Sequence, residues 1–401
     1  MDFDFTQEQV MLRNLTREFL TRESTPRAVR TLMEEANGFS AATWQQMSEM
    51  GLPGLAIDPG YGGQGLGMVE LALVLDEMGR AAYPGPFFAT VVLAASAIAA
   101  GGQPNQMARF LPDLAQGRTK ATLALIEDAL SWSASGVQLR AERRGDSFVL
   151  SGQKRFVPFA QAADLILVVA RTGTVGSASA TARPDGTTVF AITRDASGLS
   201  QALNVEMDHT SKTSTLTFEN VSVPADAVIG EVDRGWDVIG PTLQRAAIGA
   251  SAEMLGAARR CLEMSVEYAK VRHQFGQPIG AFQAIKHACA EMLLEVENAH
   301  AATYYAAWAL DAGSPDADLA ASVSKAYVGE ASREVCGSSI QVHGGIGFTW
   351  EYDLHLYVKR AKHFEPLYGD ADFHRERALQ LLLAREAATE PKPEAVAVLA
   401  S

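Results

Sequence analysis

The order of two kinds of apolar pattern along the chain constrains the fold most. Residues 1–118 and 233–388 repeat apolar side chains at helical spacing, whereas residues 119–232 contain short β-rich runs separated by turn residues. A strand-rich segment between two helical segments predicts an α+β protein. We therefore predict an N-terminal helical domain and a C-terminal four-helix bundle that pack together, with a β-barrel or sandwich beside them.

The C-terminal helical part has the longest apolar stripes. One stripe runs from Met254 to Ala269 and a second from Ile285 to Ala299. Stripes of this length predict long helices joined by short connections, as in a helix bundle. Residues 389–401, which include a Thr-Glu-Pro-Lys-Pro-Glu stretch, predict a flexible tail.

The middle segment contains five short runs that predict strands. They are rich in apolar and β-branched residues and lie between turns such as Arg144-Gly-Asp146. Such strands without long helices between them predict a small antiparallel barrel or sandwich. The runs are Ala121–Ile126, Ser147–Leu150, Leu165–Ala170, Thr187–Thr193 and Ser214–Phe218.

Composition and charge exclude two classes of partner. The formal net charge of the 401 residues is −13, and binding to nucleic acid requires clustered Lys and Arg to neutralise phosphates. The longest apolar run, near Phe87 to Ala100, is shorter than the roughly 20 residues that a membrane helix needs. We expect neither a nucleic-acid partner nor a membrane span.

Two features favour a cytoplasmic protein. The three cysteines, Cys261, Cys289 and Cys336, are odd in number and far apart, which predicts reduced buried thiols rather than a disulfide framework or a zinc site. The first residues, Met1-Asp-Phe-Asp-Phe-Thr6, lack the basic region and apolar core of a signal peptide.

A first motif, Arg272-His-Gln-Phe-Gly-Gln-Pro-Ile279, ends one predicted helix and begins a turn. An arginine fixed beside such a turn can bind a phosphate through paired hydrogen bonds. It can equally be a surface arginine, which the helix dipole favours at a helix C-terminus.

A second motif, Gln341-Val-His-Gly-Gly-Ile-Gly347, follows another predicted long helix. Glycines let a ligand approach the backbone closely, although the same residues also suit an ordinary helix C-cap and turn. No Gly-x-Gly-x-x-Gly follows a predicted strand, so the sequence does not support a Rossmann dinucleotide site.

These motifs, with Phe282-Gln-Ala-Ile-Lys-His287 and the segment Arg360 to Ala371, resemble the acyl-CoA dehydrogenase family along nearly the whole chain. The resemblance implies an FAD-dependent α,β-dehydrogenation of an acyl-CoA, with FAD held between subunits. It implies that the arginine and the Phe-Gln segment of one chain bind the pyrophosphate region, and that the Gln and Gly-Gly of another contact the adenine side. The implied cofactor residues are Arg272, Phe275, Gln283, Gln341, Gly344 and Gly345.

The middle segment departs from the family pattern in two places. Where many members have Glu-Pro-Gly-x-Gly-Ser-Asp, this chain has Glu127-Asp-Ala-Leu-Ser-Trp-Ser133. Where many have Gly-x-Lys-x-Trp-Ile-Thr facing the flavin, this chain has Gly152-Gln-Lys-Arg-Phe-Val-Pro158. Phe156 can still cover an aromatic ring and is a further cofactor candidate, whereas Pro158 offers neither a hydroxyl nor an N–H.

The family's catalytic base is the third departure. The residue after the Tyr of the Arg360 to Ala371 segment is usually the glutamate that removes the substrate's α-proton, and here it is Gly369. At the alternative family position, on the helix before Arg272, we align Ala246 and Ala247. The nearby carboxylates are Asp370, Glu253 and Glu365. We expect a solvated turn or helix cap for Asp370, and surface positions for Glu253 and Glu365.

A heteromeric enzyme reconciles the intact FAD motifs with the absent base. The chain resembles the base-lacking subunit of bacterial α2β2 acyl-CoA dehydrogenases that act on steroid side chains. Three alternatives stay open. They are a homotetrameric enzyme with Asp370 or Glu253 as relocated base, a flavin oxidase or monooxygenase on this fold, and a partner without catalysis of its own. The resemblance also implies electron transfer flavoprotein as acceptor.

Overall fold

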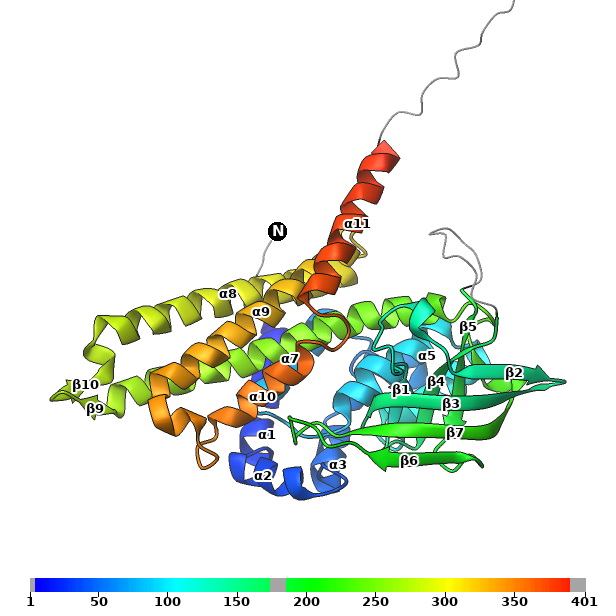
Figure 1. The fold of residues 1–401 in the computed structure, drawn as a ribbon, viewed down its shortest axis with the longest axis horizontal. Coiled ribbons are helices and arrows are strands. Elements are labelled where there is room, and N and C mark those ends of the chain that lie inside the picture. Colours follow the sequence, from blue (N-terminus) through cyan, green and yellow to red (C-terminus); the bar gives the residue numbers. More distant parts are fainter. Residues whose placement is uncertain (1–3, 174–184, 390–401) are drawn as a thin grey trace, which may run out of the picture.

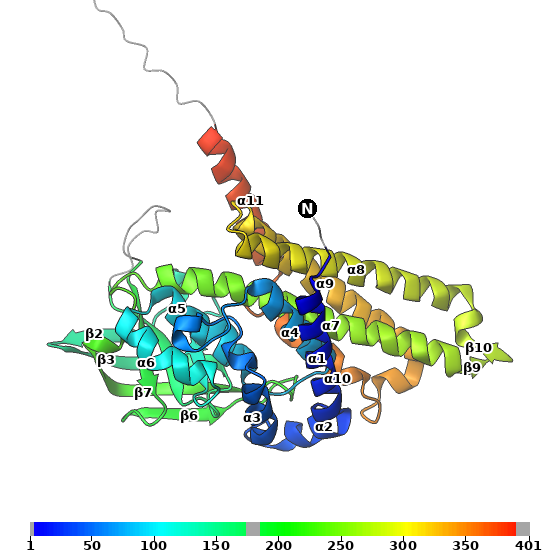
Figure 2. The same cartoon turned by 180° about the vertical axis from the view of Figure 1, so that it is seen from behind.

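The computed structural model describes residues 4–173 and 185–389 and has the three-part organisation that the sequence predicted (Figure 1). Helices from both ends of the chain pack together, and the β domain lies against one end of this helical body (Figures 1 and 2). The predicted tail, residues 389–401, lies outside the described residues except for Thr389, which ends the last helix.

In the N-terminal part, the first three helices start at capping side chains. Thr6 accepts a hydrogen bond from the Gln9 N–H in a capping box, and Thr25 caps the next helix. A π-helical segment, Phe88–Ala95, is buried throughout. The α-helices are α1 Gln7–Glu23, α2 Pro26–Glu34, α3 Ala41–Glu49, α4 Met68–Arg80, α5 Ser96–Gly101 and α6 Pro104–Ala115.

The middle part is one mostly antiparallel sheet with the order β6-β7-β3-β2-β4-β5-β8, in which β1 pairs parallel to β4. All five predicted runs form strands, whereas β2, β6 and β8 had no predicted run, because their sequences are charged, exposed or very short. The strands are β1 Ala121–Ala124, β2 Arg140–Arg144, β3 Ser147–Pro158, β4 Leu165–Arg171, β5 Thr187–Thr193, β6 Leu199–Leu203, β7 Thr213–Pro224 and β8 Val228–Ile229.

The C-terminal part is built on one long central helix, α7, which packs against α4, α8, α9 and α10. No helix among the described residues has the length and apolar character needed to cross a lipid bilayer. The three cysteines are free thiols. The helices are α7 Trp236–Val271, α8 Gln283–Asp311, α9 Ala317–His343, α10 Leu354–Phe364 and α11 Ala371–Thr389.

The helices α4 and α7 touch through glycines. A Cβ at Gly256 would lie 1.9 Å from the carbonyl oxygen of Asp76, and a Cβ at Gly79 would lie 2.0 Å from that of Glu253. Only residues without a side chain allow two helix backbones to approach so closely. This contact joins the N-terminal helical part to the C-terminal one.

The three parts also meet at a buried arginine, Arg360 of α10. Its guanidinium donates to Asp208 of the β6–β7 connection at 3.1 Å, to Glu253 of α7 at 3.2 Å and to the Tyr83 carbonyl at 2.9 Å. The Thr210 hydroxyl accepts two further bonds from it. Removing one member of such a buried network costs about 3–5 kcal/mol, because another charge is left without its partner.

We expect Gly256→Ala to destabilise the protein by about 1–3 kcal/mol, because the new methyl group has no room against α4. Gly337→Ala on α9 is the matched control, since nothing lies within 4 Å of its Cβ position. The control should stabilise the protein by about 0.5–1 kcal/mol, because Ala favours a helix over Gly. Urea denaturation measures both, and equal effects would show that the contact is not tight.

The Glu253 carboxyl should make stability depend on pH. Burial raises its pKa from 4.5 to about 7, although Arg360 opposes the shift. Between these two values the folded protein holds a proton that the unfolded chain has released, so this stabilisation is present below the lower value and is lost as pH rises to about 7.

The measurement is the free energy of unfolding of wild type minus that of Glu253→Gln, followed across pH. We expect this difference to fall from about pH 5 to pH 7.5 and then to level, with a slope of at most about 1.4 kcal/mol per pH unit. The surface variant Glu231→Gln should show no such fall. A difference that rises with pH would contradict the burial of an ionisable Glu253.

Candidate functional site

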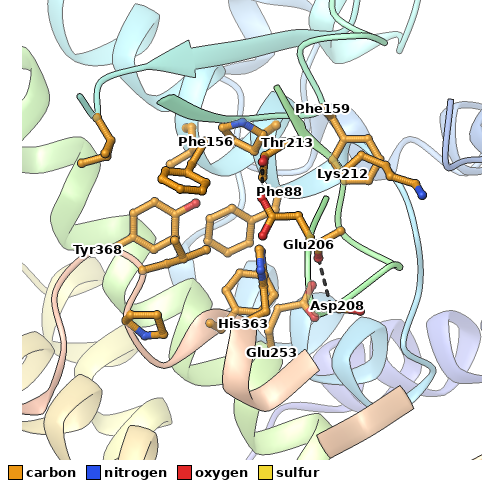
Figure 3. A pocket seen from close by; sticks show the side chains of 18 of the residues that line it. Phe88, Phe156, Phe159, Glu206, Asp208, Lys212, Thr213, Glu253, His363 and Tyr368 are labelled. Atoms are coloured by element: carbon orange, nitrogen blue, oxygen red, sulfur yellow. Dashed lines mark hydrogen bonds between the residues drawn. The ribbon is translucent and has the colours of Figure 1, made fainter. Parts of the chain in front are cut away.

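A cavity of about 570 Å³ lies where the three parts of the chain meet. We call it the interdomain cavity (Figure 3). Its walls come from the π-helical segment, from β3, from the β6–β7 connection, from α7 and from the segment after α10. Most of the lining is apolar, and its large aromatic side chains include Phe87, Phe88, Trp132, Phe156, Phe364 and Tyr368.

Aromatic rings of separate elements pack around Tyr368. Its ring stacks on Phe88 with centroids 5.3 Å apart and an interplanar angle of 15°, and it lies 5.2 Å from Trp132. Phe156 lies on the same side of the cavity (Figure 3) and is 44% exposed. Together these rings form an apolar wall of the cavity that suits another planar or ring-shaped group.

The strand that carries Phe156 offers no hydrogen-bond donor at Pro158. The Pro158 carbonyl already accepts a hydrogen bond from the Thr122 hydroxyl at 2.5 Å. Nearby, the Glu127 carboxylate accepts from the Gln138 and Leu139 N–H groups and from the buried Lys154 ammonium. Burial lowers the pKa of Lys154 to about 8, although Glu127 opposes this. The protein's own donors therefore already occupy the Glu127 carboxylate.

Glu253 is the main correction among the candidate carboxylates. We expected a surface residue, but it is 3% exposed and lines the interdomain cavity. The expectation was wrong because α7 is enclosed on nearly every side, so no face of it near Glu253 meets solvent. One carboxylate oxygen accepts from Arg360 at 3.2 Å.

Of the other two carboxylates, Asp370 behaves as expected and Glu365 only in part. Asp370 accepts a hydrogen bond from the Phe373 N–H at 2.9 Å and caps the start of α11, although it also lines the cavity. Glu365 pairs with the more exposed Arg333 and Lys362, but its own side chain is only 14% exposed, because the residues around α10 cover it.

Gly369 follows Tyr368 in a turn that a buried lysine holds in place. The Lys325 ammonium of α9 donates to the carbonyl oxygens of Glu365 and Gly369 at 2.7 and 2.8 Å. Burial lowers the pKa of Lys325 to about 7. Gly369 has φ +103°, and a Cβ there would lie 2.3 Å from Cδ1 of Phe373. This turn therefore has no room for a side chain.

Sequence reasoning missed several ionisable residues of the cavity, among them Glu206, Asp208 and His363. The Thr213 hydroxyl donates to Glu206, but burial raises the pKa of that carboxyl. Burial lowers the pKa of His363 to about 4. Although burial alone would raise it, Arg360 and His363 hold the pKa of Asp208 below its usual value. These residues occupy a connection and a helix end, where no periodic pattern marks them.

A second pocket, of about 410 Å³, lies at the tip formed by the C-terminal ends of α7 and α9. We call it the tip pocket. Arg272, Phe275, Gly344 and Gly345 all line it, together with residues such as Tyr268 and Phe282. The two segments that we expected to act from different chains therefore meet within one chain. The predicted Gln283 and Gln341 are exposed beside it, at the start of α8 and in the last turn of α9.

The tip pocket has the features of a binding surface. The Phe275 ring is 91% exposed, and nothing lies within 4 Å of the Cβ positions of Gly344 and Gly345. Among the described residues, no carboxylate pairs with the Arg272 guanidinium. An unpaired arginine, an exposed ring and open glycine backbone fit the phosphates and the planar base of a dinucleotide.

The two pockets lie far apart in one chain. The tip carries the short hairpin β9 His273–Gln274 and β10 Gln277–Pro278, at the end of the bundle away from the β domain (Figures 1 and 2). Leu243 and Glu253 of α7 line the interdomain cavity, and they lie roughly 40 Å and 30 Å of helix away from Arg272 in the tip pocket. A ligand that needs both kinds of surface must therefore take them from different chains.

Models of three family domains match the chain. The acyl-CoA dehydrogenase N-terminal domain matches residues 6–118, the middle domain residues 123–221 and the C-terminal domain residues 233–383. A probable acyl-CoA dehydrogenase of Bacillus subtilis (strain 168), YngJ, is 31% identical over 393 residues, which cover 96% of this chain and 99% of the relative.

Solved structures show the same similarity over nearly the whole chain. A chain from a variant of the Tcur3481-Tcur3483 steroid ACAD is 30% identical with a TM-score of 0.83, over 96% of this chain and 99% of that chain. A chain from work on the electron transferring flavoprotein of Acidaminococcus fermentans is 28% identical with a TM-score of 0.87, over 96% and 100%. This chain therefore belongs to the acyl-CoA dehydrogenase family of FAD-dependent oxidoreductases.

Proposed function

We propose that this chain is one subunit of a heteromeric acyl-CoA dehydrogenase, in which it lends its tip pocket to an FAD held by a related chain. In this account it brings no proton acceptor of its own to the α-carbon of the thioester. The observation that carries the proposal is the Gly369 turn, which has no space for a side chain at the position of the family's usual base.

The contacts around the turn support this proposal. The Lys325 ammonium donates hydrogen bonds to two carbonyl oxygens of the turn. The Phe373 ring and the His374 side chain occupy the space that a Cβ at Gly369 would need. A glutamate there would have to displace both side chains and adopt a backbone conformation that suits glycine. Relocating α11 to make room would break the Asp370 cap as well.

The two pockets fit FAD unequally. The tip pocket offers Arg272 for phosphates and Phe275 for stacking, whereas the interdomain cavity offers ring surfaces but no donor at Pro158. When bound, FAD would supply the hydride acceptor of the dehydrogenation. The residues of this chain would hold its phosphate end, and the related chain would complete the ring-binding half.

A second candidate function has one observation in its favour. Glu253 lines the cavity with a pKa raised by burial to about 7, which suits a general base. In a self-sufficient homotetramer it would remove the α-proton. Its contact with Arg360 and its place in the network favour the heteromer, as does the use of Asp370 as a helix cap. A turnover of the lone chain that falls at least about 100-fold in Glu253→Gln would favour the homotetramer.

Other parts of the proposal rest on similarity. Likeness to a steroid ACAD supports a bulky acyl group, such as a steroid side chain, and an α2β2 assembly. Likeness to a chain studied with an electron transferring flavoprotein supports that class of acceptor. A cytoplasmic location and a role in lipid or steroid catabolism stay predictions.

Arg272→Met should strip FAD from the complex of this chain with its related chain. Losing a charge-assisted contact to phosphate should weaken FAD binding by about tenfold or more, without loss of stability, because Arg272 is exposed and makes no ion pair within the described part of the chain. Flavin absorbance per chain after gel filtration measures this. Arg194→Met on the β domain is the control. Full flavin content in Arg272→Met would reject the tip pocket as a cofactor site.

Gly369→Ala should destabilise the protein more than Gly145→Ala. Both glycines have positive φ, of +103° and +61°, but only the Cβ of Gly369 would overlap its neighbours. Backbone strain of about 1 kcal/mol is common to both, and the overlap should add about 1–3 kcal/mol at Gly369. Urea denaturation compares them. Equal losses would mean that the turn can admit a side chain, and hence a base.

A further inference from the structure

Three pairs of side chains join α7 to α9 along a line that ends at the tip pocket. The two helices lie side by side up to the tip (Figures 1 and 2), and we call the line of paired side chains the seam. Its last pair lies in the wall of the tip pocket, so a change in the spacing of the seam changes the pocket. The pairs are Cys261 with Cys336, Ser265 with Ser339, and Tyr268 with His343.

The first pair of the seam consists of two buried thiols in contact. The Sγ atoms of Cys261 and Cys336 lie 3.7 Å apart, and the two residues are 0% and 2% exposed. The helices are close at this point, because the Ser339 hydroxyl donates to the Cys261 carbonyl oxygen at 3.0 Å. The sulfur atoms of a disulfide are ~2.0 Å apart, so a further approach of roughly 1.7 Å would join the pair.

Burial protects these thiols while the seam is closed. It raises the pKa of the Cys261 thiol well above its usual value, and the contact with Cys336 adds to this shift. A thiolate attacks an oxidant, whereas a neutral thiol does not. Oxidation therefore proceeds from a locally opened state, in which the thiols meet water and ionise as usual.

The ligand proposed for the tip pocket requires a closed seam. Arg272 follows the end of α7 and Gly344 the end of α9, so opening the seam separates two surfaces that line the pocket. His343 holds this end of the seam, since its ring stacks on Tyr268 with centroids 4.6 Å apart and its Nε2 lies 3.1 Å from the Tyr352 hydroxyl. A nucleotide bound in the pocket therefore lowers the population of the open seam by mass action.

We propose that Cys261 and Cys336 form a redox latch, in which hydrogen peroxide joins them in a disulfide while the tip pocket is empty and the disulfide then hinders flavin binding there. One thiolate first attacks the peroxide, becomes a sulfenic acid and releases a water. The second thiol then displaces the sulfenic hydroxyl as another water. Two thiols and one peroxide thus give one disulfide and two waters, and the peroxide takes up the two electrons.

The disulfide hinders binding because the pocket has its shape in the reduced chain. The Ser265 and Ser339 hydroxyls are already 2.7 Å apart in the next pair of the seam. A close-packed interior transmits strain and does not compress. Drawing the helices together at the thiols therefore has to displace the second and third pairs, and with them the wall of the pocket.

The inference rests on the proposed function in one respect, since it takes the tip pocket as a flavin site. Formation of the cross-link requires neither flavin nor turnover, so it can be measured on the lone chain whatever that chain binds. A lone chain that carries flavin and dehydrogenates an acyl-CoA would count against the proposed function and leave the cross-link to be judged on its own result.

The first test treats three samples with hydrogen peroxide, namely the complex with FAD, the complex stripped of FAD and the lone chain. Mass spectrometry after alkylation without reductant counts the peptide that joins Cys261 to Cys336. The lone chain and the stripped complex should form it. With free FAD at about 100 times its Kd, the complex should form it about 100-fold more slowly. Oxidation of Met11, which is 62% exposed, shows that the dose of peroxide was sufficient.

The second test measures the flavin content after the treated lone chain is combined with its related chain and FAD. The cross-linked chain should lose most of the flavin that the untreated chain takes up, and dithiothreitol should restore it. Cys336→Ala treated in the same way is the control and should keep its flavin. Recovery in dithiothreitol uses the wild-type chain, so the result stands even if the variant folds poorly.

Three outcomes would overturn the proposal. They are a lone chain whose Met11 is oxidised without any cross-link, equal rates of cross-linking with and without FAD, and a cross-linked chain that takes up flavin as the untreated one does. The half-buried Cys289 of α8 serves as a further control, because a loss of flavin that follows its oxidation should also occur in Cys336→Ala.

Discussion

The buried guanidinium of Arg360 is the contact on which the arrangement of the site depends. It connects α10, the β6–β7 connection, α7 and the Tyr83 carbonyl, and each of these segments forms part of the cavity wall. A charge at this depth is tolerated because each of the three guanidinium nitrogens meets an acceptor. The cavity therefore keeps its shape through directional bonds as well as through apolar packing.

A second buried cation, Lys325, fixes the segment that follows. Its bonds to Glu365 and Gly369 join α9 to the turn between α10 and α11. Two buried cations of the bundle therefore hold segments that line the cavity or lie beside it. The cost of burying them is offset by the carbonyl and carboxylate acceptors that they meet.

The sequence predicted the three-part organisation because helical and strand periodicities are local properties. It also predicted that Asp370 caps a helix, but it placed Glu365 at the surface, whereas that side chain is only 14% exposed. It did not predict the burial of Glu253, because the faces that enclose α7 come from α4 and α10, which lie far away in the sequence. Asp208 and His363 were missed for a related reason, since only tertiary packing gives them a cavity to line. Sequence reasoning also did not foresee that the Arg272 and Gly344 segments line one pocket of the same chain, where α7 and α9 end side by side.

The central claim is that this chain completes a flavin site in another chain and does not operate one alone. Native mass spectrometry of the chain purified alone and with its related chain, with flavin counted per assembly, tests this most directly. The account predicts a lone chain without flavin and a mixed assembly with one flavin for each pair of unlike chains. A homotetramer that carries one flavin per chain and dehydrogenates an acyl-CoA would contradict it.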